Sequence, residues 1–398
     1  DYFKSYVYPT VLPFTVDRAR KASIHDGLYI LTVTRHGDDE DIGYIEIPKC
    51  MPRFIQVKDE HFVIMIEDLI VANIKSILIN RKVIAAVPFA ICRSAEVYID
   101  TNHYRDPYSL IEETLKEREK SWITLVEFDG KALGKKDYLR HLLDIKTNTI
   151  VTSPGSMGIR LSDLVNIPKS VYKEKERQPE FIPYNTIPEN TGIFRYIKQK
   201  DRLVFHPFES YTGSVVRFIE DAANDPDVTS IRISLYRVAN RSRIVDALMK
   251  AADNGKLVVA LIELKARFDE KHNMEISRIM QEGGIRIVYT QPDIKTHAKV
   301  CIVTRNESKG MKIYSHISTG NYSESNGKVY TDYSYFTADQ EVGRDLVRFF
   351  NLLTANGENF KSKSIAYAPY NLKSTIVDEI NKQVWRARKK KPAQITIN

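Results

Sequence analysis

The sequence predicts an α/β and α+β multidomain protein, with a head domain of mixed α+β structure followed by an α/β domain in which helices cover both faces of a central sheet. Three observations lead to this fold class. The chain has 398 residues, which is more than one compact core usually accommodates. Residues 169–194 contain three prolines and dense charge without sustained periodicity, as expected of a domain linker. Beyond residue 213, apolar strand-like runs alternate with amphipathic helical runs, which is typical of a sheet covered by helices.

The head domain, residues 1–168, mixes strands and helices without a regular alternation. Residues 26–35 and 41–48 have the pattern of two strands joined in a hairpin. Residues 108–121 form a charged amphipathic pattern of helical period, and residues 123–128 read as a strand that ends at Asp-Gly. Strands and helices in this irregular order indicate an α+β domain.

The region from 195 to 364 is expected to be the α/β domain. Strands are predicted at residues 230–238, 256–264, 285–290, 296–304, 312–318 and 330–338. Helices are predicted at residues 214–223, 242–253, 269–281 and 341–353. Past this region, a helix predicted at 377–385 precedes a basic run, and we expect residues 365–398 to be the start of a further, truncated domain.

Composition narrows the function classes. Hydrophobic residues make up 43% of the chain and charged residues 28%, which excludes a disordered or fibrous protein. No apolar run reaches the roughly 18 residues that a membrane-spanning helix needs. The formal net charge of +8 favours a polyanionic partner such as a nucleotide, nucleic acid, polyphosphate or an anionic membrane. Cys50, Cys92 and Cys301 are far apart in apolar surroundings, which predicts buried, reduced thiols in a cytoplasmic protein.

Residues 293–302, DIKTHAKVCI, contain the one His-x-Lys pair of the sequence. In a strand, Lys295, His297 and Lys299 would project from the same face. A neutral imidazole is a good nucleophile near pH 7, and a neighbouring lysine would bind phosphate and keep the imidazole unprotonated. On spacing alone, the favoured interpretation is a solvated strand face without function.

Three other polar groups strengthen the catalytic interpretation, because each lies where a predicted strand of the same domain ends. Arg237 lies at the end of one strand, Arg267 follows the next, and Thr319-Gly320-Asn321 follows a third. Ligands of open α/β sheets gather beyond the carboxyl ends of strands, and arginine forks suit phosphate oxygens. Together with His297 they predict a phosphoryl-transfer site.

The same residues resemble a known family. The matching blocks are HPFESY (206–211), YRVA (236–239), ARFDE (266–270), KTHAK (295–299), TGN (319–321) and YTDY (330–333). In this order and spacing, they resemble bacterial polyphosphate kinase of the phospholipase-D-like type, and the resemblance runs along the whole chain. It implies that residues 195–364 are a first phospholipase-D-like catalytic domain and that 365–398 begin a second.

The resemblance also implies roles for individual residues. His297 would take the terminal phosphoryl group, and Tyr330 would contact the nucleotide. Lys299 and Asn321 stand where this type of site places phosphate-binding groups. Arg237 and Arg267 match positions assigned to magnesium and phosphate. Because a guanidinium is not a plausible ligand of a cation, we expect phosphate contacts from both arginines, with Mg²⁺ nearby.

The implied activity is the reversible transfer of the γ-phosphate of ATP to inorganic polyphosphate through a phosphohistidine. ATP, ADP and polyphosphate would be the partners and Mg²⁺ the cofactor, without nucleic acid. The family further suggests a homodimer in the cytoplasm, at most peripherally associated with the inner membrane. The chain as given is expected to be impaired, because a second His-x-Lys half-site would lie in the truncated domain.

Two other functions remain open. A phospholipase-D-like phosphodiesterase is disfavoured, because Thr304 stands where that pattern has an aspartate. A polyanion-binding module without catalysis would also fit the net charge. Asp332 could orient His297 or cap a turn, and the sequence does not decide between the two. His206 and His316 are expected to have structural roles.

Overall fold

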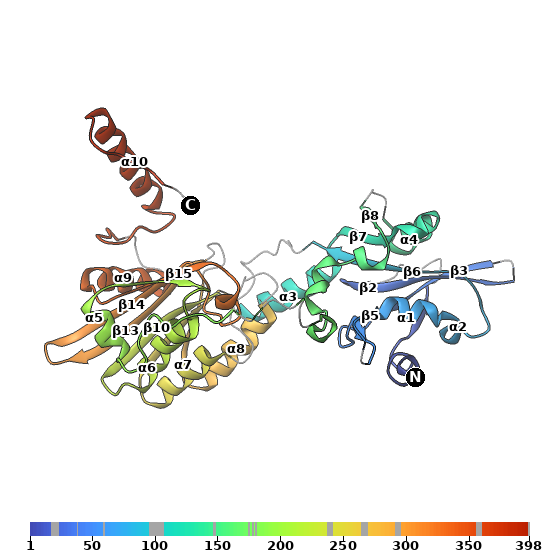
Figure 1. Cartoon of the computed structure of the whole chain (residues 1–398), viewed down its shortest axis with the longest axis horizontal. Helices are drawn as coiled ribbons and strands as arrows, with labels where there is room; N and C mark the ends of the chain where they lie inside the picture. The colour runs from blue at the N-terminus through green and yellow to red at the C-terminus, as the bar shows by residue number, and fades with distance from the viewer. Residues whose placement is uncertain are drawn as a thin grey trace. The chain divides into compact units, whose positions relative to one another are not determined.

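The computed structural model describes residues 1–16, 24–37, 39–58, 60–94, 107–145, 149–173, 176, 179, 181–236, 242–263, 270–290, 296–355 and 360–396 (Figure 1). Contacts divide the chain into two compact units. The first comprises Asp1–Asp100 and Glu112–Glu180, and the second Thr101–Ile111 and Phe181–Asn398. The finer boundaries at 168/169, 194/195 and 364/365 stay predictions.

Among its described residues, the first unit contains a six-stranded sheet of order β1-β3-β2-β6-β7-β8. These strands are β1 (Pro13–Thr15), β2 (Gly27–His36), β3 (Asp39–Glu46), β6 (Lys82–Arg93), β7 (Ile123–Asp129) and β8 (Ile150–Ser153). The other strands and α-helices of this unit are β4 (Phe54–Gln56), β5 (Val63–Met65), α1 (Ile66–Ala72), α2 (Ile74–Ile77) and α4 (Lys136–Leu143). The helix α3 (Pro107–Lys120) has residues in both units, since the second unit includes Thr101–Ile111. β2 and β3 pair antiparallel, which confirms the predicted hairpin. The mixed α+β character is also confirmed.

Apolar side chains fill both faces of this sheet. Ile30 of β2 packs with Ile66 and Ile70 of α1 on one face. Leu31, the next residue of the same strand, packs with Leu139 of α4 on the other. The alternation of side chains along a strand therefore supplies two cores from one sheet.

The described residues of the second unit form a seven-stranded sheet of order β12-β11-β10-β13-β14-β15-β9. The strands are β9 (Arg202–His206), β10 (Val228–Leu235), β11 (Leu257–Ile262), β12 (Arg286–Tyr289), β13 (Lys299–Glu307), β14 (Gly310–Ser318) and β15 (Asp332–Thr337). The helices are α5 (Ile193–Gln199), α6 (Arg217–Asn224), α7 (Arg243–Asp253), α8 (Glu270–Glu282), α9 (Gln340–Ala355) and α10 (Leu372–Arg388). β10, β11 and β12 are parallel, and the other neighbours are antiparallel.

Helices cover both faces of this second sheet, as predicted (Figure 1). Val300 and Ile302 of β13 pack with Leu346 and Phe350 of α9 on one face. On the other face, Phe218 of α6 makes an edge contact with Phe336 of β15. The α/β class is therefore confirmed. Within the part of the chain that the structure describes, every helix is too short or too polar to span a bilayer.

Local sequence signals explain several helix ends. The hydroxyl of Ser242 accepts a hydrogen bond from the N–H of Val245 and so caps the start of α7. Gly255 and Gly284 follow α7 and α8 with φ angles of +77° and +81°, a conformation that glycine adopts without strain. These two helices therefore end within one residue of their expected places.

Two of the three thiols correct the prediction of buried cysteines. Cys301 is buried, but Cys50 and Cys92 are exposed. Cys50 lies in the turn after β3, and Cys92 is the next-to-last residue of β6, beyond the buried Ala90 on the same face of the strand. The apolar run alone did not reveal that the cover of this strand ends before Cys92.

Candidate active site

The predicted nucleophile lies at one end of the second unit's sheet. β10 and β11 finish at Leu235 and Ile262, and β13 runs antiparallel to β10, so that it starts where they finish. β14 ends at Ser318, directly opposite Lys299. His297 comes two residues before the start of β13 and is exposed. We call this end of the sheet the site end.

Lys299 is buried beside the exposed His297, which corrects the prediction that the two share a strand face. β13 begins only at Lys299, so strand alternation does not apply to His297, and Lys295 lies outside the described residues. The Nζ of Lys299 donates a hydrogen bond to the carbonyl oxygen of His297 at 2.5 Å. The ring of Tyr236 lies edge-on to His297, with centroids 5.0 Å apart, and 5.3 Å from the Nζ of Lys299. Tyr236 therefore packs against both members of the pair.

Both members of the pair have lowered pKa values. Burial lowers the pKa of Lys299 to about 8, although the negative charge of Asp332 acts in the opposite direction. Partial burial, and then the positive charge of Lys299, lower the pKa of His297 below its ordinary 6.5. At pH 7 the imidazole is therefore neutral, as a nucleophile must be, while most of the Lys299 ammonium is still charged.

His297 and Lys299 line a cavity of about 610 Å³. Its polar end also contains Thr296, Ser318 and Thr319. Its apolar wall consists of residues of α9 and of the segment that follows it: Leu346, Phe349, Leu353, Ile365, Tyr367 and Leu372. A cation, hydroxyl groups and a neutral imidazole at one end suit the oxygens of a phosphoryl group.

Asp332 holds the turn that follows β14. The Oγ1 of Thr319 donates to the Oδ1 of Asp332 at 2.7 Å and accepts from the N–H of Tyr333 at 2.9 Å. A Cβ at Gly320 would lie 2.5 Å from the Oδ2 of Asp332, so this close approach requires glycine. Asp332 thus acts on the turn through a hydrogen bond and on Lys299 through its charge.

Asn321 and Tyr330 are not among the residues that line the cavity. The carbonyl oxygen of Asn321 accepts from the hydroxyl of Tyr211 at 3.2 Å, and its Oδ1 is buried without a partner in the described structure. Tyr330 precedes β15 instead of belonging to it and is 60% exposed. Their expected contacts with phosphate and nucleotide stay predictions.

Arg237 and Arg267 lie outside the described residues, but the strand ends that lead to them are placed. The side-chain N–H₂ of Asn273 in α8 donates to the carbonyl oxygens of Tyr236 at 2.9 Å and of Glu263 at 3.1 Å. The ends of β10 and β11 are therefore tied together one residue before Arg237 and four before Arg267. In the described parts of the chain, no three histidine, cysteine or acidic residues are grouped so as to hold a metal ion.

Sequence reasoning missed the contact between Glu263 and the segment that contains His297. The side chain of Glu263 is 3% exposed, and its Oε2 accepts from the N–H of Thr296 at 2.8 Å, directly before His297. The available signal was a glutamate within the apolar run 257–264, where a buried acid needs a hydrogen-bond partner.

The two other histidines of interest are buried and structural. His206 bonds through Nδ1 to the carbonyl oxygen of Glu209 at 3.0 Å and through Nε2 to the hydroxyl of Ser334 at 2.9 Å. Nδ1 of His316 lies 2.8 Å from the hydroxyl of Tyr322, and burial lowers the pKa of His316 to about 3. Both positions agree with the predicted structural roles.

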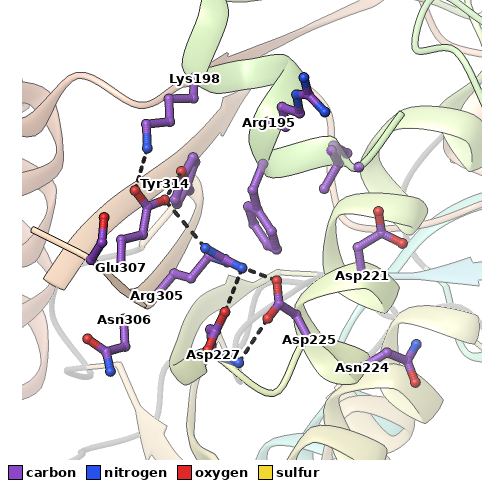
Figure 2. A pocket seen from close by; sticks show the side chains of 14 residues that line it. Arg195, Lys198, Asp221, Asn224, Asp225, Asp227, Arg305, Asn306, Glu307 and Tyr314 are labelled. Carbon is purple, nitrogen blue, oxygen red and sulfur yellow. Dashed lines mark hydrogen bonds and ion pairs between the residues drawn. The ribbon is translucent and has the colours of Figure 1, made fainter. Parts of the chain in front are cut away.

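Figure 2 shows a second cavity, of about 880 Å³, at the opposite end of β13. There Arg305 pairs with Asp225 and Asp227 at 2.9 and 2.8 Å, and Lys198 pairs with Glu307 at 2.5 Å. These charges neutralise one another and join α5 to the sheet. The arrangement indicates a structural network and none of the chemistry of the site end.

The family model described as the polyphosphate kinase middle domain matches residues 1–167, and the model of the polyphosphate kinase C-terminal domain 1 matches residues 192–359. The chain belongs to the polyphosphate kinase family.

Curated polyphosphate kinases resemble nearly the whole chain. The polyphosphate kinase of Erythrobacter litoralis is 35% identical over 99% of this chain and 55% of its own length. Polyphosphate kinase 1 of Chlorobaculum tepidum is 32% identical over 99% of this chain and 58% of its own length. The crystal structure of polyphosphate kinase from Porphyromonas gingivalis matches with a TM-score of 0.76 and 25% identity, over 98% of this chain and 58% of that one. The chain therefore spans a little over half the length of these polyphosphate kinases.

Proposed function

We propose that this chain supplies the nucleophile of an ATP:polyphosphate phosphotransferase, in which His297 carries the phosphoryl group. The observation that supports this most strongly is the exposed imidazole of His297, kept neutral at the mouth of a cavity by partial burial and by Lys299. Membership of the polyphosphate kinase family gives the substrates that this chemistry would use.

In the proposed reaction, a nitrogen of His297 attacks the γ-phosphorus of ATP, the bond to the β,γ-bridging oxygen breaks, and ADP leaves with its electron pair. The terminal phosphate of polyphosphate then attacks the phosphohistidine, and the imidazole leaves as a neutral base. Because a phosphoramidate retains high transfer potential, both steps are reversible. The protein contributes mainly positioning and charge, for which Lys299, Ser318 and Thr319 line the polar end.

Finer roles are proposed for two arginines outside the described residues and for two residues outside the cavity lining. Arg237 and Arg267 would contact phosphate, Asn321 would do so after rotation of its amide, and Tyr330 would contact the nucleotide. Mg²⁺ would be held chiefly by the oxygens of ATP, since hard oxygen ligands are what it prefers. The proposed homodimer, the cytoplasmic location and any peripheral membrane association rest on the family alone.

The test is labelling of the full-length gene product with γ-labelled ATP. We expect acid-labile, base-stable label that is lost in His297→Ala. His141→Ala is the matched control, because His141 is also exposed but lies in α4 of the first unit. Undiminished label in His297→Ala would refute the assignment of the nucleophile. Release of a headgroup or nucleotide without any phosphoenzyme would support a phosphodiesterase instead.

A further inference from the structure

The backbone around His297 is held by side chains rather than by strand pairing. The register of β10 and β13 ends at Ile233 and Cys301, so it stops before it reaches the histidine. Thr296, His297 and Ala298 belong to no strand and directly precede β13. Another set of contacts must therefore fix this segment, because a misplacement of about 1 Å in a nucleophile can cost about a hundredfold in rate.

Ser234 supplies the contact on one side of His297. Its hydroxyl donates to the carbonyl oxygen of Ala298 at 2.7 Å and accepts from the N–H of Val300 at 3.0 Å. Ser234 is 4% exposed and belongs to β10. A side-chain hydroxyl thus occupies the place that a backbone partner would have in a continued ladder.

Glu263 supplies the contact on the other side. Glu263 directly follows β11, and β10 lies between β11 and β13 in the sheet. The side chain of Glu263 therefore reaches across one strand to accept a hydrogen bond from the N–H of Thr296 at 2.8 Å. Both polar backbone groups of Glu263 are hydrogen-bonded. The N–H donates to the carbonyl oxygen of Leu235 at 3.0 Å, and the carbonyl oxygen accepts from the side chain of Asn273 at 3.1 Å. The acceptor offered to Thr296 is therefore rigidly placed.

We infer that Glu263 and Ser234 form a clamp that positions His297 for in-line attack, without contact with the substrate. Glu263 holds the N–H that precedes the histidine, and Ser234 holds the carbonyl oxygen that follows it. The clamp residues are positioning residues. This inference deepens the proposed function and rests on it for the role of His297.

The experiment compares four variants in the full-length gene product. Glu263→Ala and Ser234→Ala each remove one arm of the clamp, and Glu263→Gln keeps an oxygen acceptor of similar shape. Asp225→Asn is the matched control, because Asp225 also accepts a backbone N–H, from Asp227 at 2.9 Å, but at the opposite end of β13 (Figure 2).

Two readouts separate the clamp from the proposed function. The first is the rate of phosphoenzyme formation at saturating ATP, together with KM for ATP. We expect Glu263→Ala and Ser234→Ala to lower the rate by roughly 10- to 100-fold with KM changed by less than about threefold, while Glu263→Gln and Asp225→Asn stay within about threefold of the parent. The second is amide hydrogen exchange of residues 296–300, which should accelerate in both alanine variants and not in Asp225→Asn.

The outcomes are distinguishable. A parent protein that forms no phosphohistidine, with exchange still accelerated at 296–300, would overturn the proposed function and support the clamp. Normal phosphorylation and unchanged exchange in Glu263→Ala and Ser234→Ala would overturn the clamp and leave the proposed function standing. If Glu263→Ala does not fold, Ser234→Ala decides in the same way. An equal loss of rate in Asp225→Asn would also overturn the clamp, because the effect would then be general destabilisation.

Discussion

The positive charge of Lys299 acts on the imidazole of His297 at close range. Partial burial, and then this charge, lower the pKa of His297, and burial brings the pKa of Lys299 itself to about 8. From the sequence we predicted that a neighbouring lysine would keep the imidazole of His297 unprotonated. That prediction assumed a strand that extended through His297, which the structure does not contain. Neighbours at i and i+2 meet here because Lys299 folds back onto the carbonyl oxygen of His297. Only the three-dimensional path of residues 296–298 reveals that contact.

The pKa values predict a bell-shaped pH dependence for phosphorylation of His297. The rate should rise as His297 loses its proton, with a midpoint below pH 6.5, and fall as Lys299 loses its charge near pH 8. In Lys299→Met the loss of a nearby positive charge should raise the pKa of His297 towards its ordinary value. The fall in the phosphorylation rate near pH 8 should also disappear. NMR titration of the His297 ring measures the first effect without any need for activity.

Lys198→Met is the control for this titration, because Lys198 is a charged lysine paired with Glu307 at the opposite end of β13. It should leave the pKa of His297 unchanged. A pKa of His297 that is the same in Lys299→Met as in the parent would show that burial alone causes the lowering.

At the scale of elements, the alternation of strands and helices was predictable because each signal is local. Apolar runs, amphipathic periods and the Asn-Gly and Gly-Gly stops lie within a few residues of the elements they define. The sheet order was not predictable, because β9 pairs with β15, more than a hundred residues away along the chain. The functional consequence is that β14 and β15 bring Thr319 and Asp332 beside Lys299, an arrangement that depends entirely on long-range pairing.

The turn between β14 and β15 should tolerate no side chain at Gly320. Gly320→Ala would place a Cβ 2.5 Å from the Oδ2 and 2.7 Å from the Cγ of Asp332, and we expect it to lower the free energy of unfolding by about 1–3 kcal/mol. Gly192→Ala is the control, because a Cβ added at Gly192 would meet no other atom within 4 Å. Urea denaturation measures both, and the control should stay within about 0.5 kcal/mol of the parent. Equal stability of the two variants would contradict the tight turn.

At the scale of the whole molecule, one boundary between the two units falls inside the proline-rich segment. The chain passes from the first unit to the second between Glu180 and Phe181, within the predicted linker 169–194, although Thr101–Ile111 also belongs to the second unit. Proline and charge mark where periodicity stops, but they do not show to which unit each flanking residue packs. The extent of the relatives beyond this chain could not be read from composition at all.

Because each unit has its own core, we predict that the chain unfolds in two steps. Differential scanning calorimetry of residues 1–398 should show two transitions. A fragment of residues 181–398, which contains the second unit without Thr101–Ile111, should reproduce one of them alone. A single cooperative transition for the whole chain, with a fragment that does not fold, would contradict two independent units.

The claim that His297 carries the phosphoryl group can be tested most directly by locating the modification. The full-length gene product is incubated briefly with ATP and Mg²⁺, digested at alkaline pH to preserve phosphohistidine, and sequenced by fragmentation mass spectrometry. We expect one phosphate on the peptide that contains residues 296–299, located on His297 and lost after ADP is added. Phosphate on another residue, with His297 unmodified at all times, would contradict it.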